Sequence, residues 1–414
     1  MIVSYNVQNL FDITYDGTEY DGYIPDTAYN WNIGMLNIKA RNIARVIKDL
    51  NADVITLQEI ESKKSLVYLQ KILFSLGIDY PYFAIADSKA TTVKCAVMSR
   101  FPIIKKEEIS VHNKFARNIL KITLDIEGHF LVLFVNHWKS KQGPESQRIA
   151  YAKKLKEEID KLKEGIDFIL TGDFNSNYNE YEIFQDSSSL NDTVSTTGIN
   201  HILRTIKGSE MVNERILMEQ ATNEYLYNLW LEINKSRRWS CNFFGKKNSL
   251  DSIIVSKGLY DNKGISYVDN SFDKFDPDYL FKKNAVYRWQ ITENGRGKHL
   301  GEGYSDHLPI FAYFSTEPFQ FKNNKTICSD TVSLKLKKTK SPQGLINLNT
   351  ATKKELQTIK GIGPVLSIRI ATGRPYKTID NLIKVKGIGP KTLEKIRPYL
   401  VVDEKINNED IQTP

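Results

Sequence analysis

A polar, lysine-rich stretch limits most strongly what this chain can fold into. From residue 315 it reads STEPFQFKNNKTICSDTVSLKLKKTKSPQG, without a periodic apolar face, and patterned sequence resumes behind it. Such composition is typical of a linker. The chain of 414 residues is also longer than one core usually fills. The sequence therefore predicts two folded domains, over residues 1–315 and 344–402, joined by a linker at 316–343 and followed by a tail at 403–414.

Charge is divided unequally along the chain. Residues 331–414 hold 16 Lys and Arg against 7 Asp and Glu, whereas the first 330 residues hold 41 against 42. The net charge of +8 therefore resides in the C-terminal part. A basic appendage on a neutral body indicates a polyanionic partner, and a tail that only aids solubility is the alternative.

Cysteine usage and hydropathy exclude several protein classes. Cys95, Cys241 and Cys328 have no metal-type spacing and predict buried thiols rather than a disulfide framework. The longest apolar run, Phe130 to Val135, is too short to span a bilayer. The chain enters a strand-like segment at once, which is compatible with a cytoplasmic protein and equally with an exported protein whose leader is missing.

The first domain alternates between helical and strand-like patterns. Apolar residues at helical spacing between Leu36 and Leu50 precede the apolar run ADVITL. Helices are also expected from Ser65 to Leu76 and from Pro144 to Lys163, the second leading into the strand IDFIL. Several further strands follow one another without a helix: KCAVMS, NILKITLDI, HFLVLFVNHW, SIIVS and LPIFAYF. This pattern predicts an α/β fold with largely antiparallel sheets.

Polar residues that handle metals and phosphates follow several of these strands. They lie in SYNVQNLFD, ITLQEIE, NHWKSK, TGDFNS, LDSIIVS and YSDHLPI, and comprise Asn6, Glu59, His137, Asp173, Asn175, Asp251, Asp306 and His307. Side chains placed just after strands gather at one edge of a sheet. Taken singly, each has a structural reading, such as a turn-forming Asp or a surface His, and only the ordered set indicates one site. The other histidines, His112, His129, His201 and His299, have no partner motif and are expected at the surface.

These residue types suit the hydrolysis of a phosphodiester. Glu59 and Asn6 offer hard oxygen ligands for a cation that neutralises the phosphate. Asp173 could orient or deprotonate a water, and Asn175 could donate a hydrogen bond to a phosphate oxygen. An Asp251–His307 pair would keep the imidazole charged for stabilising the pentavalent phosphorus or protonating the leaving oxygen.

The ordered set resembles the endonuclease/exonuclease/phosphatase superfamily of metal-dependent phosphodiesterases, from about Ile2 to Phe314. The resemblance implies a four-layered αββα sandwich of two mainly antiparallel sheets. It also implies metal-binding positions at Asn6 and Glu59, and places Asp306 where it can join the metal shell. By the same resemblance, His137, Asp173, Asn175, Asp251 and His307 are catalytic. Lys139 and Lys141 could contact the substrate backbone or be ordinary surface lysines.

The second domain contains KGIGP twice, at residues 360–364 and 386–390. Glycines permit a tight turn with exposed amides, and a following helix start aims further amides the same way, which forms an oxyanion nest. A plain turn between helices is the alternative for either copy alone. The span from about Leu345 to Leu400 resembles the paired, all-α helix-hairpin-helix module of competence-type DNA-uptake proteins. This implies sequence-independent contacts with DNA phosphates at Gly361, Gly363, Gly387 and Gly389, beside Lys360, Lys386 and Lys391.

The two halves together predict a divalent-metal-dependent deoxyribonuclease that uses Mg²⁺, Mn²⁺ or Ca²⁺. The second domain would bind DNA without sequence preference, and we expect a monomer without an obligate protein partner. Two alternatives remain open: a phosphodiesterase for another phosphoester, such as a phospholipid head group, or a non-catalytic DNA-binding or uptake protein.

Overall fold

The computed structural model describes residues 1–111, 116–184, 189–243, 245–321, 346–359, 361–376 and 378–402. The chain divides into two compact units, Met1–Lys325 and Thr326–Pro414, and each is described by itself. Cys328, His112, Lys360 and most of the expected linker lie outside the described residues, as does the tail.

Two six-stranded sheets form the centre of the larger unit, and the first carries the N-terminal strand. Its order is β16 (Asp273–Lys274), β19 (Ile310–Ala312), β1 (Ile2–Leu10), β2 (Val54–Ile60), β4 (Lys94–Ser99), β3 (Tyr82–Ile85). Only β1 and β2 pair in parallel, and the other neighbours are antiparallel.

The second sheet repeats this arrangement. Its order is β11 (Tyr227–Asn228), β14 (Asp251–Val255), β8 (Asp167–Asp173), β7 (His129–His137), β6 (Ile119–Ile126), β5 (Ile103–Ile109). Again a single pair, β7 with β8, is parallel. Each sheet therefore has one parallel pair among antiparallel neighbours, which confirms the mainly antiparallel prediction.

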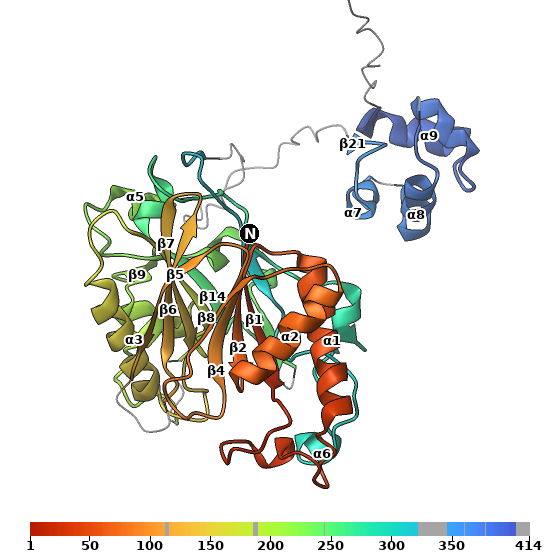
Figure 1. Cartoon of the computed structure of the whole chain (residues 1–414). Coiled ribbons are helices and arrows are strands. Elements are labelled where there is room, and N and C mark those ends of the chain that lie inside the picture. Colours follow the sequence, from red (N-terminus) through yellow and green to blue (C-terminus); the bar gives the residue numbers. More distant parts are fainter. Residues whose placement is uncertain are drawn as a thin grey trace, which may run out of the picture. The chain divides into compact units, whose positions relative to one another are not determined.

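Helices cover the outer faces of the two sheets (Figure 1). The helices α1 (Ile33–Leu50) and α2 (Lys63–Ser75) pack on the first sheet through a buried cluster that includes Ala40, Ile47 and Leu69. Helix α3 (Glu145–Ile159) packs on the second sheet through Tyr151 and Leu155. A third apolar cluster lies between the sheets. The four-layered αββα sandwich is thus confirmed.

Local sequence explains where these helices begin and end. The Asn32 side chain accepts hydrogen bonds from the amides of Gly34 and Met35 and so caps α1, and Ser62 forms a capping box with Ser65 at the start of α2. Helix α3 ends at Ile159, four residues before the expected end at Lys163. The following stretch, DKLKEG, supplies few apolar residues that would hold a further turn against the sheet.

The remaining elements of the larger unit are short. They are α4 (Glu180–Ile183), α5 (Glu214–Glu219), α6 (Thr292–Gly295), β9 (Ile206–Lys207), β10 (Glu210–Met211), β12 (Cys241–Phe243), β13 (Lys246–Asn248), β15 (Ser266–Tyr267), β17 (Phe281–Lys282), β18 (Ala285–Val286), β20 (Phe314–Ser315), a π-helix η2 (Gly198–Ile202), and the 3-10 helices η1 (Asp21–Tyr23), η3 (Leu229–Glu232), η4 (Lys235–Arg237), η5 (Lys257–Tyr260), η6 (Asp278–Leu280).

One histidine expected at the surface is part of the core. His299 is 1% exposed, accepts a hydrogen bond from the Trp289 indole at 2.8 Å and packs edge-on against Tyr23. The surface prediction for His299 was therefore wrong, because aromatic residues distant in sequence enclose the ring. His201 is exposed and His129 is partly exposed.

The smaller unit contains the two glycine hairpins. The first joins α7 (Lys353–Gln357) to α8 (Pro364–Thr372), and the second joins the 3-10 helix η7 (Ile379–Lys384) to α9 (Pro390–Ile396). Both prolines occupy the first turn after a glycine N-cap, as predicted. A 3-10 helix η8 (Arg397–Tyr399) follows α9.

The core of the smaller unit is separate and includes Leu356, Ile370, Leu382 and Ile396. The unit is helical as predicted, with one addition: β21 (Ile346–Asn347) and β22 (Leu400–Val401) pair in parallel and tie its two ends together. Among the helices of the described residues, none has both the length and the apolar composition needed to cross a bilayer.

Candidate active site

Three of the predicted residues form one row across the second sheet. His137 on β7 lies opposite Asp173 on β8, and Asp173 lies opposite Asp251 on β14. Residues opposite one another in a sheet project to the same face. All three are buried, with exposures of 3%, 2% and 1%. The strand register itself therefore assembles one imidazole and two carboxylates in a row, with Asp173 in the middle.

The strands β7 and β8 approach one another closely beside this row. Gly172 has a φ of +124°, and a Cβ at this position would lie 2.1 Å from the backbone oxygen of Asn136. No side chain fits at that distance, so a glycine must precede Asp173. After Asp173 the chain turns, because the Asp173 Oδ1 atom accepts a hydrogen bond from the Asn175 amide at 2.8 Å.

Asn6 joins the two sheets at the site. Its Nδ2 atom donates to Glu59 Oε1 and to Asp173 Oδ2, each at 3.1 Å, while its Oδ1 atom accepts from the Gln8 amide at 3.0 Å. The amide nitrogen, rather than the oxygen, thus faces the carboxylates. Asn6 was predicted as a metal-binding residue, and in this arrangement it holds the two carboxylates in place.

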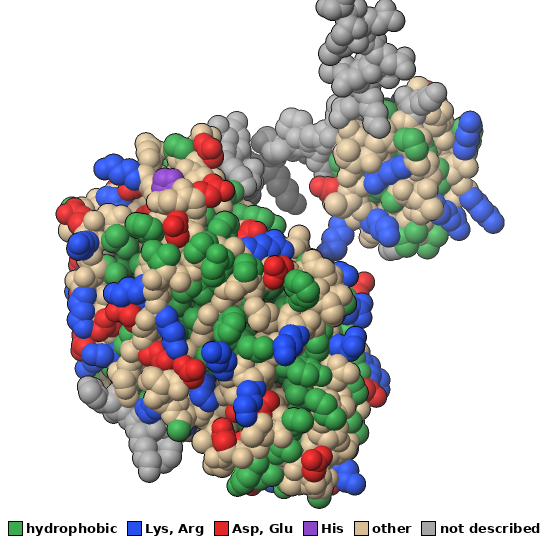
Figure 2. Space-filling model, viewed as in Figure 1, with side chains coloured by type: hydrophobic (Ala, Val, Ile, Leu, Met, Phe, Trp, Pro, Cys, Tyr) green, Lys and Arg blue, Asp and Glu red, His purple; other side chains and the backbone are tan. Residues whose placement is uncertain are grey.

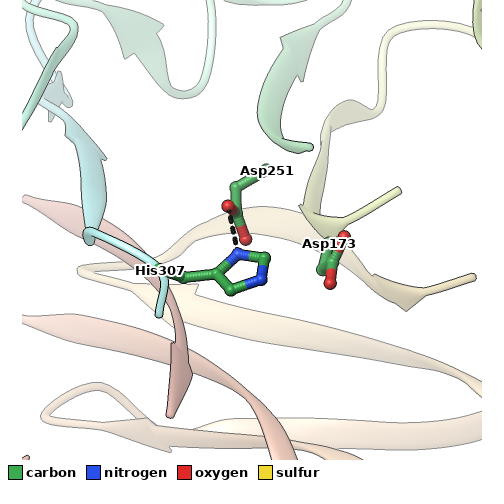
Figure 3. Close-up of side chains that lie close together, drawn as sticks. All are labelled: Asp173, Asp251 and His307. Atoms are coloured by element: carbon green, nitrogen blue, oxygen red, sulfur yellow. Dashed lines mark hydrogen bonds and ion pairs between the residues drawn. The ribbon is translucent and has the colours of Figure 1, made fainter. Parts of the chain in front are cut away.

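Asp251 and His307 form the predicted pair (Figure 3). The His307 Nδ1 atom lies 2.7 Å from Asp251 Oδ2, and the Ser240 hydroxyl donates to the same oxygen at 2.6 Å. Burial alone would lower the His307 pKa, but the Asp251 carboxylate outweighs it and holds that pKa well above its usual value. His307 is therefore the charged imidazole of the site.

His137 is the neutral imidazole. Its Nε2 atom lies 3.7 Å from both Glu59 Oε1 and Asp173 Oδ2, and its buried Nδ1 atom has no hydrogen-bond partner among the described residues. Burial, with the charges of Arg117 and His307, lowers the His137 pKa well below its usual value. The two histidines are thus tuned in opposite directions.

The carboxylates around Asn6 fit a hard divalent cation. Burial raises the Glu59 pKa, and the negative charge of Asp306 raises it further. Burial also raises the Asp173 pKa, to about 7. Such repulsion between carboxylates is what a divalent cation relieves, and oxygen ligands are those that Mg²⁺ and Ca²⁺ prefer. Ligand atoms of Asp173, Asp251 and His307 also lie within 4.8 Å of one another.

Other predicted residues are placed less directly for substrate contact. Asn175 donates its Nδ2 hydrogen to the Trp138 carbonyl at 3.1 Å. Asp306 lies 3.8 Å from the Arg288 guanidinium. Lys141 forms an ion pair with the buried Glu180 at 2.7 Å, which favours the structural reading of this lysine.

Several residues of the site were not predicted from sequence. Ser240 supports Asp251, and Ser305 donates to the Asn6 carbonyl at 2.6 Å while accepting from the His307 amide. Arg117 adds positive charge beside Glu59 and His137. For the serines no local pattern gives a signal, whereas Arg117 stands directly before a predicted strand, as the other site residues stand at strand ends.

A cavity of about 710 Å³ adjoins the site. Gln8, two residues after Asn6, lines this cavity. Arg288 also lines it and lies 3.8 Å from Asp306. Its lining residues include Tyr20, Tyr23, Tyr29, Trp289, Arg288 and Arg296. Tyr20, Arg288 and Arg296 are exposed and Tyr29 is half-buried. An accessible aromatic ring together with guanidinium groups suits a planar, anionic ligand such as a nucleotide.

The glycine hairpins of the smaller unit present backbone amides. Gly363 and Gly389 are exposed N-caps of α8 and α9, and neither amide has a hydrogen-bond acceptor among the described residues. Gly361 and Gly387 precede them with φ values of +115° and +104°. Arg369 donates to the Lys386 carbonyl at 2.7 Å and so links α8 to the second hairpin. Lys386 is exposed, while Lys360 and the Lys391 side chain lie outside the described part.

Comparisons with known proteins match both parts of the chain. Residues 1–316 match the model of the "Endonuclease/Exonuclease/phosphatase family", and residues 341–401 match that of the "Helix-hairpin-helix motif". ComE operon protein 1 of Bacillus subtilis is 44% identical over 63 residues. This match covers 14% of the chain and 30% of that protein, so the chain spans less than a third of this relative's length.

Three solved structures similar to the chain are a humanized TDP2 from D. rerio, an endonuclease/exonuclease/phosphatase family protein from Leptotrichia buccalis, and the mannosyl-6-phosphatase Bt3783 from Bacteroides thetaiotaomicron. They are 16%, 16% and 14% identical, with TM-scores of 0.47, 0.45 and 0.43. Each match covers 76% of this chain and 98% of the other.

Proposed function

Because the chain belongs to the endonuclease/exonuclease/phosphatase family and carries a helix-hairpin-helix motif, we propose that it is a divalent-metal-dependent nuclease that hydrolyses DNA phosphodiester bonds. Both resemblances predicted from sequence are confirmed by these matches, including the competence-type module. Members of the family are hydrolases of phosphoester bonds, typically dependent on divalent metal. The DNA substrate and the roles of single residues are the proposal.

The proposed base is Asp173. Hydrogen bonds from Asn175 and Asn6 fix its two carboxylate oxygens, and its pKa of about 7 suits proton transfer at neutral pH. Asp173 would accept a proton from the attacking water as the water oxygen bonds to phosphorus and the bond from phosphorus to the leaving oxygen breaks. His307, charged through Asp251, would stabilise the negative charge that builds up on the phosphoryl group.

Glu59 and Asp306 are the residues we assign to the cation. Bound there, the cation would neutralise phosphate charge and stabilise the leaving oxygen. Asn6 would keep Glu59 and Asp173 at a fixed separation, since its Nδ2 atom donates to both. His137, which is neutral, could donate a hydrogen bond to a phosphate oxygen without adding a charge that competes with the cation.

The observation that carries the choice of DNA is the pair of glycine hairpins in the same chain. Their exposed N-cap amides and flanking cations suit phosphate groups spaced along a duplex and recognise no base. The cavity lined by tyrosines and arginines beside the site suits a nucleotide as well. A phospholipid head group would make no use of the hairpins.

A plasmid assay tests this function. Supercoiled plasmid is incubated with the full chain in Mg²⁺, Mn²⁺ or Ca²⁺, with and without chelator, beside Asp173→Ala to exclude a contaminating nuclease. Nicking that requires a divalent ion and is absent in Asp173→Ala is expected. Sphingomyelin hydrolysis without plasmid cutting would move the substrate to lipid. Failure on both, with retained DNA binding, would show a binding protein with an inert catalytic fold.

A further inference from the structure

A second group of carboxylates lies outside the proposed catalytic set. Glu214 begins α5, Glu232 ends the 3-10 helix η3, and Asp269 lies between β15 and β16. One ligand oxygen from each lies within 4.8 Å of the others. Three chain segments therefore converge on one point through negatively charged side chains.

The charges of Glu214 and Glu232 are not neutralised by basic side chains in the part of the chain that the structure describes. No Lys, Arg or His among the described residues forms an ion pair with Glu214 or Glu232. The Tyr267 hydroxyl donates to Glu232 Oε2, which leaves Glu232 Oε1 buried without a partner, and Glu214 Oε1 is in the same situation. Buried acceptor oxygens in this arrangement require a cation or shared protons.

A buried hydroxyl faces the same point. Tyr260 is 4% exposed and its ring belongs to the core, yet its hydroxyl makes no hydrogen bond of normal geometry within the described chain. The hydroxyl is close enough to Glu214 to influence the pKa of that residue. A water bound to a cation at this point would give the hydroxyl a partner of normal geometry.

We propose that Glu214, Glu232 and Asp269 bind a hard divalent cation of the Ca²⁺ type, at a site separate from the catalytic one. Ca²⁺ accepts carboxylates in irregular geometry and needs few waters, whereas Mg²⁺ demands an octahedron and retains its waters. Carboxylates from three separate segments, without a common backbone loop, match the first behaviour better than the second.

A cation bound at this site would hold in place the segment that contacts β14, the strand of Asp251. Within η3, which ends at Glu232, the Trp230 indole donates to the Asp251 backbone oxygen at 2.7 Å and packs against Phe272. Just before it, Asn228 donates to the Ser252 hydroxyl at 3.2 Å. A cation that fixes Glu232 therefore fixes the segment behind the Asp251–His307 pair. The expected consequence is stability of the larger unit, with only a secondary effect on turnover.

Terbium luminescence and melting curves test the site in chelator-treated full-length protein. Tb³⁺ should be excited through the neighbouring tyrosines and displaced by Ca²⁺. The Glu59→Gln background removes a ligand of the proposed catalytic cation, so a Tb³⁺ signal that persists there and is lost on adding Glu232→Gln or Asp269→Asn belongs to the new site. Glu219→Gln, an exposed acid on α5, is the matched control and should change nothing.

In the melting curves, Ca²⁺ in large excess should raise the Tm of the Glu59→Gln protein by about 5 °C, and the shift should vanish with Glu232→Gln. Glu232→Gln is expected to fold, because it removes uncompensated charge. The site would be disproved if Ca²⁺ at about 10 mM leaves Tm unchanged, a concentration above the weak end of protein calcium sites. A Ca²⁺ shift that survives in both Glu232→Gln and Asp269→Asn would also overturn it.

Discussion

The two compact units differ in the atoms they would present to a phosphate. The larger unit gathers side chains that are almost fully buried, among them Asp173, Asp251 and His137. The smaller unit presents exposed backbone amides at Gly363 and Gly389, and on the face drawn in Figure 2 it carries many Lys and Arg side chains. Burial shifts the pKa values that acid-base chemistry needs, whereas a binding surface must stay open to a long polymer. Acid-base catalysis thus requires buried groups and polymer binding requires exposed ones. The larger unit meets the first requirement and the smaller unit meets the second.

The largest effect that tests this contrast between the two units is expected at Asp173. Asp173→Asn should lower kcat for plasmid and for bis(p-nitrophenyl) phosphate alike, by about 10²- to 10⁴-fold, because the proposed base is lost. Steady-state rates on both substrates and the Kd for DNA are the measurements. DNA affinity should be unchanged, and Asp160→Asn, an exposed acid after α3, serves as the control. A loss restricted to plasmid would contradict the proposed role.

The next effect concerns the His307 charge. Asp251 raises the His307 pKa, so the charged imidazole is present below that raised value and is lost as pH rises through it. Asp251→Asn removes the carboxylate while burial remains, and the pKa should fall. The alkaline limb of the kcat/KM profile should therefore move to lower pH, with a rate loss of roughly 10²-fold at pH 8. A parallel loss of rate at every pH would instead indicate damage to the fold.

A smaller and substrate-selective effect is expected from removing residues 326–414. The two units have separate cores, so the larger one should remain folded. Turnover of bis(p-nitrophenyl) phosphate should be unchanged, and kcat/KM for plasmid should fall roughly 10- to 100-fold, because the tether no longer concentrates DNA. The dependence of DNA binding on salt should become flatter. Equal loss on both substrates would refute the division of labour.

The smallest effect separates two kinds of glycine within one hairpin. At Gly389 a Cβ meets nothing within 4 Å, so Gly389→Ala should fold normally and weaken DNA binding about 3- to 10-fold by obstructing the exposed amide. At Gly387 the φ of +104° and a Cβ contact of 3.0 Å with Leu366 make alanine strained. Gly387→Ala should lower the free energy of unfolding of the module by about 1–3 kcal/mol. Fluorescence anisotropy and melting curves distinguish the two.

The sequence was sufficient to predict the fold and the residues His137, Asp173 and Asp251, which lie opposite one another in the second sheet. It was not sufficient for residues whose role depends on contacts with distant parts of the chain. Short apolar runs predicted the strands β4, β7 and β8, because strands that are buried on both faces leave a continuous apolar stretch in the sequence. The ordered motifs predicted Asn6, Asp173 and His307 together. Ser240 and Ser305 were missed because their value depends on the atoms they face, and serines of this kind occur throughout any chain.

The same limit explains the error in placing His299, and it also applies to the orientation of Asn6. His299 is enclosed by Tyr23 and Trp31 from far away in the sequence, which no local window around His299 contains. Asn6 carries oxygen and nitrogen on one side chain, and only the Gln8 amide and the two carboxylates decide which atom turns inward. The sequence gives the residue type at each position, whereas the orientation of its side chain depends on the residues that surround it in the fold.

Gly172 has a practical consequence for anyone who searches genomes for relatives with the same site or designs variants of this protein. An aspartate can occur at many positions of a protein, but the space between residue 172 and the Asn136 backbone has room only for the hydrogen atom of a glycine. A relative that has an aspartate aligned with Asp173 but any residue other than glycine before it must have moved these two strands apart, and must have changed the distance between that aspartate and the imidazole that corresponds to His137. The glycine is therefore a more selective criterion for an intact row of site residues than the carboxylate that follows it.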